Sequence, residues 1–149
     1  MIRVVLDSNV LVAAALWENG SPARVLDHIL ADEKFALVLS DFILDETRHV
    51  LLRPKLTKYF TKIPDREAFV AEFIGRLDRF RVPVHEESVV DMIPNDPSDN
   101  RVLACALDGA AHILVTGNDH HFGQLGIWEG IDILTPRAFL EKYLNASFQ

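Results

Sequence analysis

Residues 2–11 read IRVVLDSNVL, and this stretch decides how the chain is expected to fold. The run VVL at residues 4–6 is typical of a buried strand, and apolar residues resume directly after Asp7, Ser8 and Asn9. Any one of these three polar residues can cap a helix, because such side chains accept hydrogen bonds from the free N–H groups at a helix start. Capping requires only one of them, so three in succession indicate a second role for this turn, which depends on where the other acids lie.

Outward from this turn, apolar runs alternate with helical patterns. Ser21 is expected to cap the second helix, with Pro22 at its first position, and Thr135 to cap the last. The pattern predicts strands at 2–6, 35–40, 81–85, 112–117 and 131–134, and helices at 9–16, 20–33, 40–52, 65–80, 96–110 and 135–144. Strands separated by helices predict an α/β fold with a mainly parallel sheet covered by helices, and such a sheet binds ligands at the carboxyl ends of its strands.

Composition limits the classes of protein to consider. The 149 residues fit a single domain at 1–149, and the hydrophobic share of 49% with a charged share of 25% is ordinary for a soluble globular protein. No apolar run approaches the roughly 20 residues of a membrane span, and no signal peptide pattern opens the chain. The single cysteine, Cys105, excludes an internal disulfide. We therefore expect a cytoplasmic protein with no membrane association.

The net charge of −7 argues against binding nucleic acid by bulk electrostatics, but one segment is locally basic. Residues 47–64 contain five cations and no acid. This segment therefore carries a charge of +5, so the rest of the chain must carry −12 to give the net charge of −7. Tyr59 and Phe60 lie among the cations, so the segment either binds an RNA backbone and stacks on its bases or forms a solvated surface. The five cations are Arg48, Arg53, Lys55, Lys58 and Lys62.

Several acids are expected at one edge of the sheet. Asp7 directly follows the first strand, and Asn118 and Asp119 follow the strand at 112–117 in the same way. Parallel strands bring these positions to a common carboxyl edge. Asp99 opens the helix DNRVLACAL after a turn at Pro97, and its carboxylate faces this edge only if that helix starts there.

Glu46 is the most informative of these acids. At about 100° per residue, Glu46 falls within the apolar stripe of its helix, between Phe42 and Val50, whereas Asp45 points away. A carboxylate facing a core is costly unless it is paired or binds a cation. Capping accounts for each of the other acids taken singly, but it accounts poorly for Glu46.

Gathered carboxyl groups point to a metal ion. Without compensating charge they would repel one another, and some would keep their protons at neutral pH. Oxygen ligands with few histidines favour Mg²⁺ or Mn²⁺ over zinc, and the usual chemistry of such a site is phosphodiester hydrolysis.

Four motifs in order, VVLDSNVL, LSDFILDETRHVL, DPSDNRVLACAL and ILVTGND, resemble the PIN domain, and GSPARVL with ILTPRAFL resembles VapC-like toxins of toxin–antitoxin systems. The resemblance covers nearly the whole chain. It implies a three-layer α/β/α domain, an Mg²⁺- or Mn²⁺-dependent ribonuclease acting on RNA, a cognate antitoxin and a homodimer. By position, Asp7, Glu46 and Asp99 match the catalytic and metal-binding acids, and the side chains expected to support them are Ser8, Asn9 and Thr116.

The sequence departs from the family pattern at the fourth acidic position. Counting two residues from Thr116 gives Asn118, with Asp119 one residue later, so either Asn118 ligates through its carbonyl or Asp119 serves as ligand and catalytic acid. A neutral ligand weakens a second metal site, so we expect one bound ion. The departure also leaves open a degenerate module that binds metal or a partner without cleaving RNA. Adjacent His120 and His121 fit a solvated loop better than a zinc site.

Overall fold

The computed structural model describes residues 1–94, 96–117 and 125–144. Within these residues one six-stranded sheet has the order β3-β2-β1-β4-β6-β5. All neighbouring strands pair in parallel except β5 and β6, which pair antiparallel. The strands are β1 (Ile2–Leu6), β2 (Phe35–Ser40), β3 (Val82–Val84), β4 (Ile113–Val115), β5 (Ile127–Trp128) and β6 (Ile131–Leu134).

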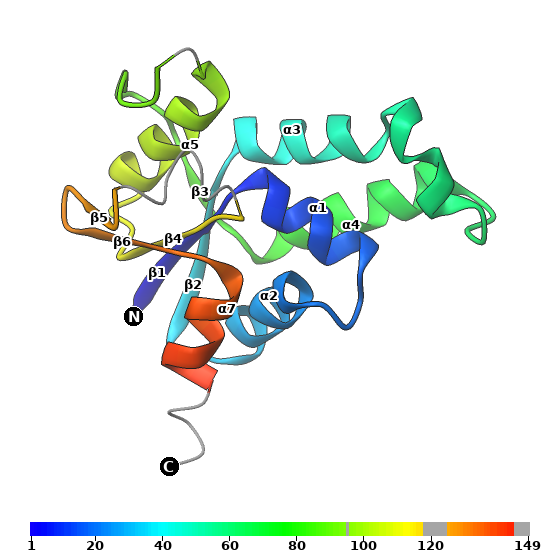
Figure 1. Cartoon of the computed structure of the whole chain (residues 1–149), viewed down its shortest axis with the longest axis horizontal. Helices are drawn as coiled ribbons and strands as arrows, with labels where there is room; N and C mark the ends of the chain where they lie inside the picture. The colour runs from blue at the N-terminus through cyan, green and yellow to red at the C-terminus, as the bar shows by residue number, and fades with distance from the viewer. Residues whose placement is uncertain (95, 118–124, 145–149) are drawn as a thin grey trace.

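Helices cover both faces of this sheet. The helices are α1 (Ser8–Leu16), α2 (Ser21–Ala31), α3 (Asp41–Leu51), α4 (Arg66–Phe80), α5 (Pro97–Asp108) and α7 (Pro136–Phe139), with short helical turns η1 (Pro54–Phe60) and η2 (Leu140–Leu144). Right-handed crossovers place α1 to α4 on one face, and the return crossover from β3 to β4 places α5 on the other (Figure 1). Helix α7 packs beside α2. The predicted three-layer α/β/α fold is confirmed.

Some local details differ from the sequence-based expectations. Gly20, not Ser21, occupies the N-cap of α2, and Ser21 is already helical. Strand β5 was not predicted, because two residues are too few to produce an alternating pattern. The last helix is α-helical only to Phe139 and continues as a π-helical turn. Thr135 does cap it, since its hydroxyl accepts a hydrogen bond from the N–H of Ala138 at 3.1 Å.

The register of β1 against β4 defines the carboxyl edge of the sheet. Leu6 pairs with Val115, and the N–H of Asp7 donates to the carbonyl of Val115 at 3.0 Å. The residues that follow these two strands, Asp7 and Thr116, therefore lie side by side. Both are almost completely buried. The sheet register thus brings together two polar side chains that are far apart in the sequence.

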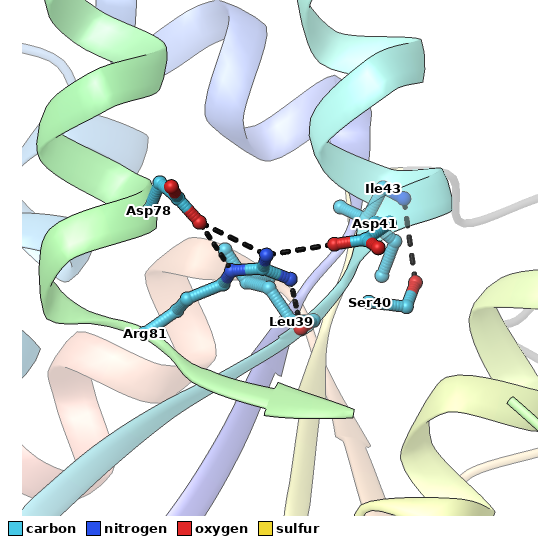
Figure 2. A network of polar contacts seen from close by, with 6 residues as sticks. All are labelled: Leu39, Ser40, Asp41, Ile43, Asp78 and Arg81. Atoms are coloured by element: carbon cyan, nitrogen blue, oxygen red, sulfur yellow. Dashed lines mark hydrogen bonds and ion pairs between the residues drawn. The ribbon is translucent and has the colours of Figure 1, made fainter. Parts of the chain in front are cut away.

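Arg81 anchors the start of α3 to the end of α4 (Figure 2). Its guanidinium donates to the carbonyl of Leu39 at 3.0 Å, to Asp41 at 2.7 Å and to Asp78 at 2.9 Å. Burial opposes its charge, but the hydrogen bonds that it donates to the two carboxylates raise the pKa of Arg81 above its ordinary value. The hydroxyl of Ser40 also caps α3, accepting from the N–H of Ile43 at 3.3 Å. The start of α3 is therefore held in one position relative to β2.

Apolar side chains from both helical layers pack against the sheet to form the main core. Cys105 lies in this core and is fully buried, as expected from its apolar sequence context. Burial raises the pKa of its thiol to about 11, so the thiol is uncharged at neutral pH. In the described part of the chain, no helix combines the length and apolar character needed to span a membrane.

Candidate functional site at the carboxyl edge of the sheet

Asp7 stands at the N-cap position of α1, yet its side chain does not cap the helix. One carboxylate oxygen, Oδ2, accepts a hydrogen bond from the hydroxyl of Thr116 at 2.9 Å and from the amide of Asn9 at 3.3 Å. The other, Oδ1, accepts from the hydroxyl of Ser8 at 3.4 Å. The carboxylate therefore turns away from the helix axis toward the polar groups at the edge of the sheet. Helix capping does not explain this aspartate.

The electrostatics of Asp7 show that other acids are close. Its pKa is raised from 3.8 to about 6, chiefly because burial disfavours the charged form. The hydrogen bond from Thr116 acts in the opposite direction, while the negative charges of Asp99 and Glu46 raise the pKa further. Three carboxyl groups from three separate segments therefore converge at this edge of the sheet.

Glu46 lies on the inner side of α3, as its place in the helical repeat predicted. Its side chain is partly buried and accepts a hydrogen bond from the hydroxyl of Ser8, whereas neighbouring Asp45 is exposed. The Ser8 hydroxyl also lies within hydrogen-bonding distance of Asp7, so its single proton can be donated to either acid. Ser8 therefore lies between the two acids.

Asp99 reaches the site because α5 begins at the carboxyl edge, which the sequence could not establish. It lies in the first turn of α5 and is 7% exposed. The carboxylate of Asp96 caps the helix by accepting a hydrogen bond from the N–H of Asp99 at 3.0 Å. The partly positive N-terminus of α5 favours a negative charge at this position.

Asn100 is a positioning residue that sequence reasoning missed. Its buried side-chain carbonyl accepts from the N–H groups of Met92 at 2.9 Å and Ile93 at 2.8 Å, and its amide donates to the carbonyl of Ile93 at 3.0 Å. The segment before α5 is thereby fastened to the helix one residue after Asp99. A polar amide next to a candidate ligand, at the start of an otherwise apolar helix, was the signal available in the sequence.

Asn9 links the first turn to the end of β4. Its carbonyl accepts from the N–H of Gly117 at 3.2 Å, while its amide contacts Asp7. Asn9 and Thr116 therefore both hold the Asp7 carboxylate, as expected of supporting residues. The remaining candidates lie outside the described residues, namely Asn118, Asp119, His120 and His121.

The donor chemistry of the cluster fits a hard divalent cation, because the converging side chains offer oxygen atoms alone. Repulsion from Asp99 and Glu46 contributes to the raised pKa of Asp7, and a bound cation would relieve it. Over the ranges 1–94, 96–117 and 125–144, however, no three His, Cys, Asp or Glu side chains are already grouped as a ligand set for a metal. The three acids converge, but in the described residues they do not already form a set of metal ligands.

The predicted basic segment lies on the surface beside α3. All five of its cations are exposed, and their sequence neighbour Arg66 holds the segment in place. The guanidinium of Arg66 donates to the carbonyls of Leu51 at 2.6 Å and Arg53 at 2.8 Å and to the hydroxyl of Thr57 at 3.1 Å. It also lies over the ring of Phe60 at 4.5 Å from the centroid. The segment is therefore fixed rather than loosely attached.

Comparisons with known proteins identify the family and the fold. An uncharacterized protein of Methanocaldococcus jannaschii is 29% identical over 150 aligned residues, which cover 95% of this chain and 92% of that protein. A solved structure, VapBC2 from Rickettsia felis bound to a DNA fragment from their promoter, matches with a TM-score of 0.60 at 14% identity, covering 90% of this chain and 98% of the matched chain. At that identity the similarity shows the fold alone. The family model for the PIN domain matches residues 3–120, most of the chain, and the chain therefore belongs to the PIN domain family.

Proposed function

We propose that this protein is a divalent-metal-dependent endoribonuclease and the toxin of a toxin–antitoxin pair. PIN domains are generally nucleases. The observation that carries the proposal is the convergence of Asp7, Glu46 and Asp99, which leaves Asp7 buried at 2% exposure with its pKa raised to about 6. A protein does not gain stability from such an arrangement, so we attribute it to function.

The three acids are the proposed metal ligands. Asp7 and Asp99 are held by the sheet edge and by the start of α5, so they would fix the position of a bound Mg²⁺ or Mn²⁺. Glu46, on α3, is less buried, and we propose it as the third acidic ligand. When bound, the ion supplies a Lewis acid that activates water and stabilises charge on the scissile phosphate. Ser8, Asn9 and Thr116 keep the Asp7 carboxylate oriented, and we propose Asn118 or Asp119 as the fourth ligand.

The basic segment gives the RNA backbone a place to bind beside the acids. Arg48 lies two residues after Glu46 on α3, and the other four cations extend along and beyond η1. These cations would draw the phosphates of a single strand toward an acidic surface that otherwise repels them. We therefore propose that Arg48, Arg53, Lys55, Lys58 and Lys62 contact the substrate.

The test is cleavage of a panel of single-stranded and structured RNAs by the purified protein with Mn²⁺ or Mg²⁺, and with EDTA as a control. We expect Asp7→Asn, Glu46→Gln and Asp99→Asn to lower the rate by more than roughly 100-fold, beyond the 10- to 100-fold typical of residues that only orient a metal ligand. Asp45→Asn is the matched control for Glu46→Gln, since Asp45 is the adjacent exposed acid on α3. Cleavage that survives EDTA, or equal loss in the Asp45 variant, contradicts the proposal.

A second candidate is a module that binds metal or a partner without cleaving RNA. It is favoured by the lack of a preformed three-residue ligand set among residues 1–94, 96–117 and 125–144. Calorimetric titration with Mn²⁺ separates the two candidates when no cleavage is found. Binding of one ion that is lost in Asp99→Asn identifies a binding module. No binding at all rules out a bound metal ion in both candidate functions.

We also propose a cognate antitoxin, a homodimer and a cytoplasmic location. The fold shared with VapBC2 supports the antitoxin. The single buried Cys105, which forms no disulfide within the chain, suits a reducing compartment and so supports the cytoplasmic location. A small reading frame next to the gene, whose product relieves growth arrest on co-expression, tests the antitoxin. Light scattering of the purified protein tests the dimer.

A further inference from the structure

A pocket of about 280 Å³ opens beside the acidic cluster. It lies between α1, the end of α3 and η1, and its lining includes Ser8, Asn9, Trp17, Lys55 and Tyr59. Ser8 is also the residue whose hydroxyl lies between Asp7 and Glu46, within hydrogen-bonding distance of both. The pocket is therefore continuous with the candidate site and shares a wall with it.

Two aromatic rings form the outer part of this pocket. Trp17 and Tyr59 meet edge to face, with ring centroids 5.4 Å apart and an interplanar angle of 74°. Both side chains remain substantially exposed, at 49% for Trp17 and 42% for Tyr59. The exposed parts of these rings can contact a flat ligand, and a base stacked on an aromatic ring is a common element of single-strand recognition.

The charges around the pocket select for an anion. Lys55 lines it, and the ammonium of Lys58 lies 5.2 Å from the centroid of the Tyr59 ring. Arg53 and Lys62 are also exposed on the same segment. The rest of the protein is acidic, with a net charge of −7 for the whole chain. The other lining residues are mainly apolar, among them Leu16, Val50 and Leu56, and of the described residues Lys55 is the one cation in the lining. An occupant with a flat, largely apolar group and a negatively charged flank therefore matches the pocket.

The pocket is preformed. Beneath η1, the side chains of Val12, Leu51, Phe60 and Val70 form a separate buried cluster that supports the segment. The hydrogen bonds of Arg66 to two backbone carbonyls fix the turn from α3 into η1. A rigid pocket binds without the cost of ordering its own side chains. Its volume lies just below the roughly 300–1,000 Å³ of pockets that hold drug-sized ligands, which suits one base with its sugar.

We infer that this pocket is a nucleobase subsite, in which one unpaired base of an RNA strand stacks on the ring of Tyr59 and meets Trp17 edge to face, while its phosphates contact Lys55 and Lys58. The subsite places the neighbouring phosphodiester beside Ser8 and hence beside the acids. It also favours single-stranded RNA, because a paired base cannot enter the pocket. This inference rests on the proposed function, since it specifies the substrate of the same site.

Trp17 provides a direct binding signal. The chain has two tryptophans, so Trp128→Phe leaves Trp17 as the single reporter. The probes are a uridine RNA hexamer and an abasic oligomer of equal length and charge, each titrated in EDTA so that metal-dependent cleavage is prevented. We expect the RNA hexamer to quench the emission of Trp17 and the abasic oligomer to leave it unchanged. Equal quenching by both oligomers shows that only phosphates bind and overturns the inference.

Substitutions then test the aromatic wall. On the single-tryptophan background, Tyr59→Ala should weaken binding of the RNA hexamer by roughly 5- to 150-fold, the loss of one base–aromatic stack, and Tyr59→Phe should retain it. Phe80→Ala is the control, because Phe80 is also an exposed aromatic residue but lines a different cavity. Unchanged affinity in Tyr59→Ala overturns the inference, as does displacement of bound RNA by an acidic Glu–Tyr copolymer at lower concentration than by RNA itself.

The two proposals fail in different ways. If the emission of Trp17 is quenched only by the oligomer with bases and no RNA is cleaved in Mn²⁺, the nucleobase subsite is supported and the nuclease is contradicted. If cleavage depends on metal and Tyr59→Ala loses neither RNA affinity nor cleavage rate, the nuclease is supported and the nucleobase subsite is contradicted.

Discussion

Replacing Asp7 by asparagine should stabilise the metal-free protein while removing its activity. In the unfolded chain this carboxyl has a pKa near 3.8, and in the folded chain burial raises its pKa to about 6 with a further contribution from Asp99 and Glu46. Such a difference costs the folded state about 3 kcal/mol once the group is ionised. Asparagine has nearly the same shape and can still accept the hydrogen bond from Thr116, so Asp7→Asn should recover most of that free energy.

The pH dependence identifies the cause. The protonated form of Asp7 stabilises the wild-type fold fully below pH 3.8, and this contribution is lost as pH rises through about 6. The variant has no such group. In EDTA, Asp7→Asn and wild type should therefore be equally stable near pH 3.8 or below and should diverge to about 3 kcal/mol above pH 7. For a chain of this size that corresponds to a rise in Tm of roughly 6–12 °C.

Urea unfolding followed by circular dichroism, at several pH values in EDTA, measures the difference. Asp45→Asn serves as the control, since a change at an exposed site should stay within about 0.5 kcal/mol of wild type. Adding Mn²⁺ should stabilise wild type and not Asp7→Asn, which narrows the gap. If Asp7→Asn is no more stable than wild type above pH 7, the carboxylate is not strained by its surroundings and the argument for a functional cluster fails.

Three further predictions follow from individual contacts. Thr116→Val removes a hydrogen bond that holds the pKa of Asp7 down, so that pKa should rise further and the acidic limb of the cleavage pH profile should move to higher pH. Asn100→Ala leaves three backbone groups, two of them buried, without their side-chain partner, which should lower the free energy of unfolding by roughly 1–3 kcal/mol in urea titrations and also reduce the cleavage rate. Gly109→Ala places a Cβ 2.6 Å from Val38, which should cost about 1–3 kcal/mol by thermal unfolding, with no change in cleavage rate at low temperature.

The local sequence was sufficient to place two acids of the site, although they lie far apart in the chain. Asp7 follows a buried strand, and Glu46 lies in the apolar stripe of a helix; both positions can be read within a few residues, because strand ends and helical periodicity are local properties. The structure agrees with both placements. The α/β order of strands and helices was readable for the same reason.

Tertiary structure alone decided how these side chains are used. The sequence allowed Asp7 to cap α1, but the register of β1 against β4 places Thr116 beside it and turns the carboxylate toward the sheet edge. The arrival of Asp99 at the same edge depends on the long return crossover to α5. Likewise, Trp17 and Tyr59 meet only because η1 folds back onto α1. Contacts of this kind join segments by packing and register, which no local pattern in the chain encodes.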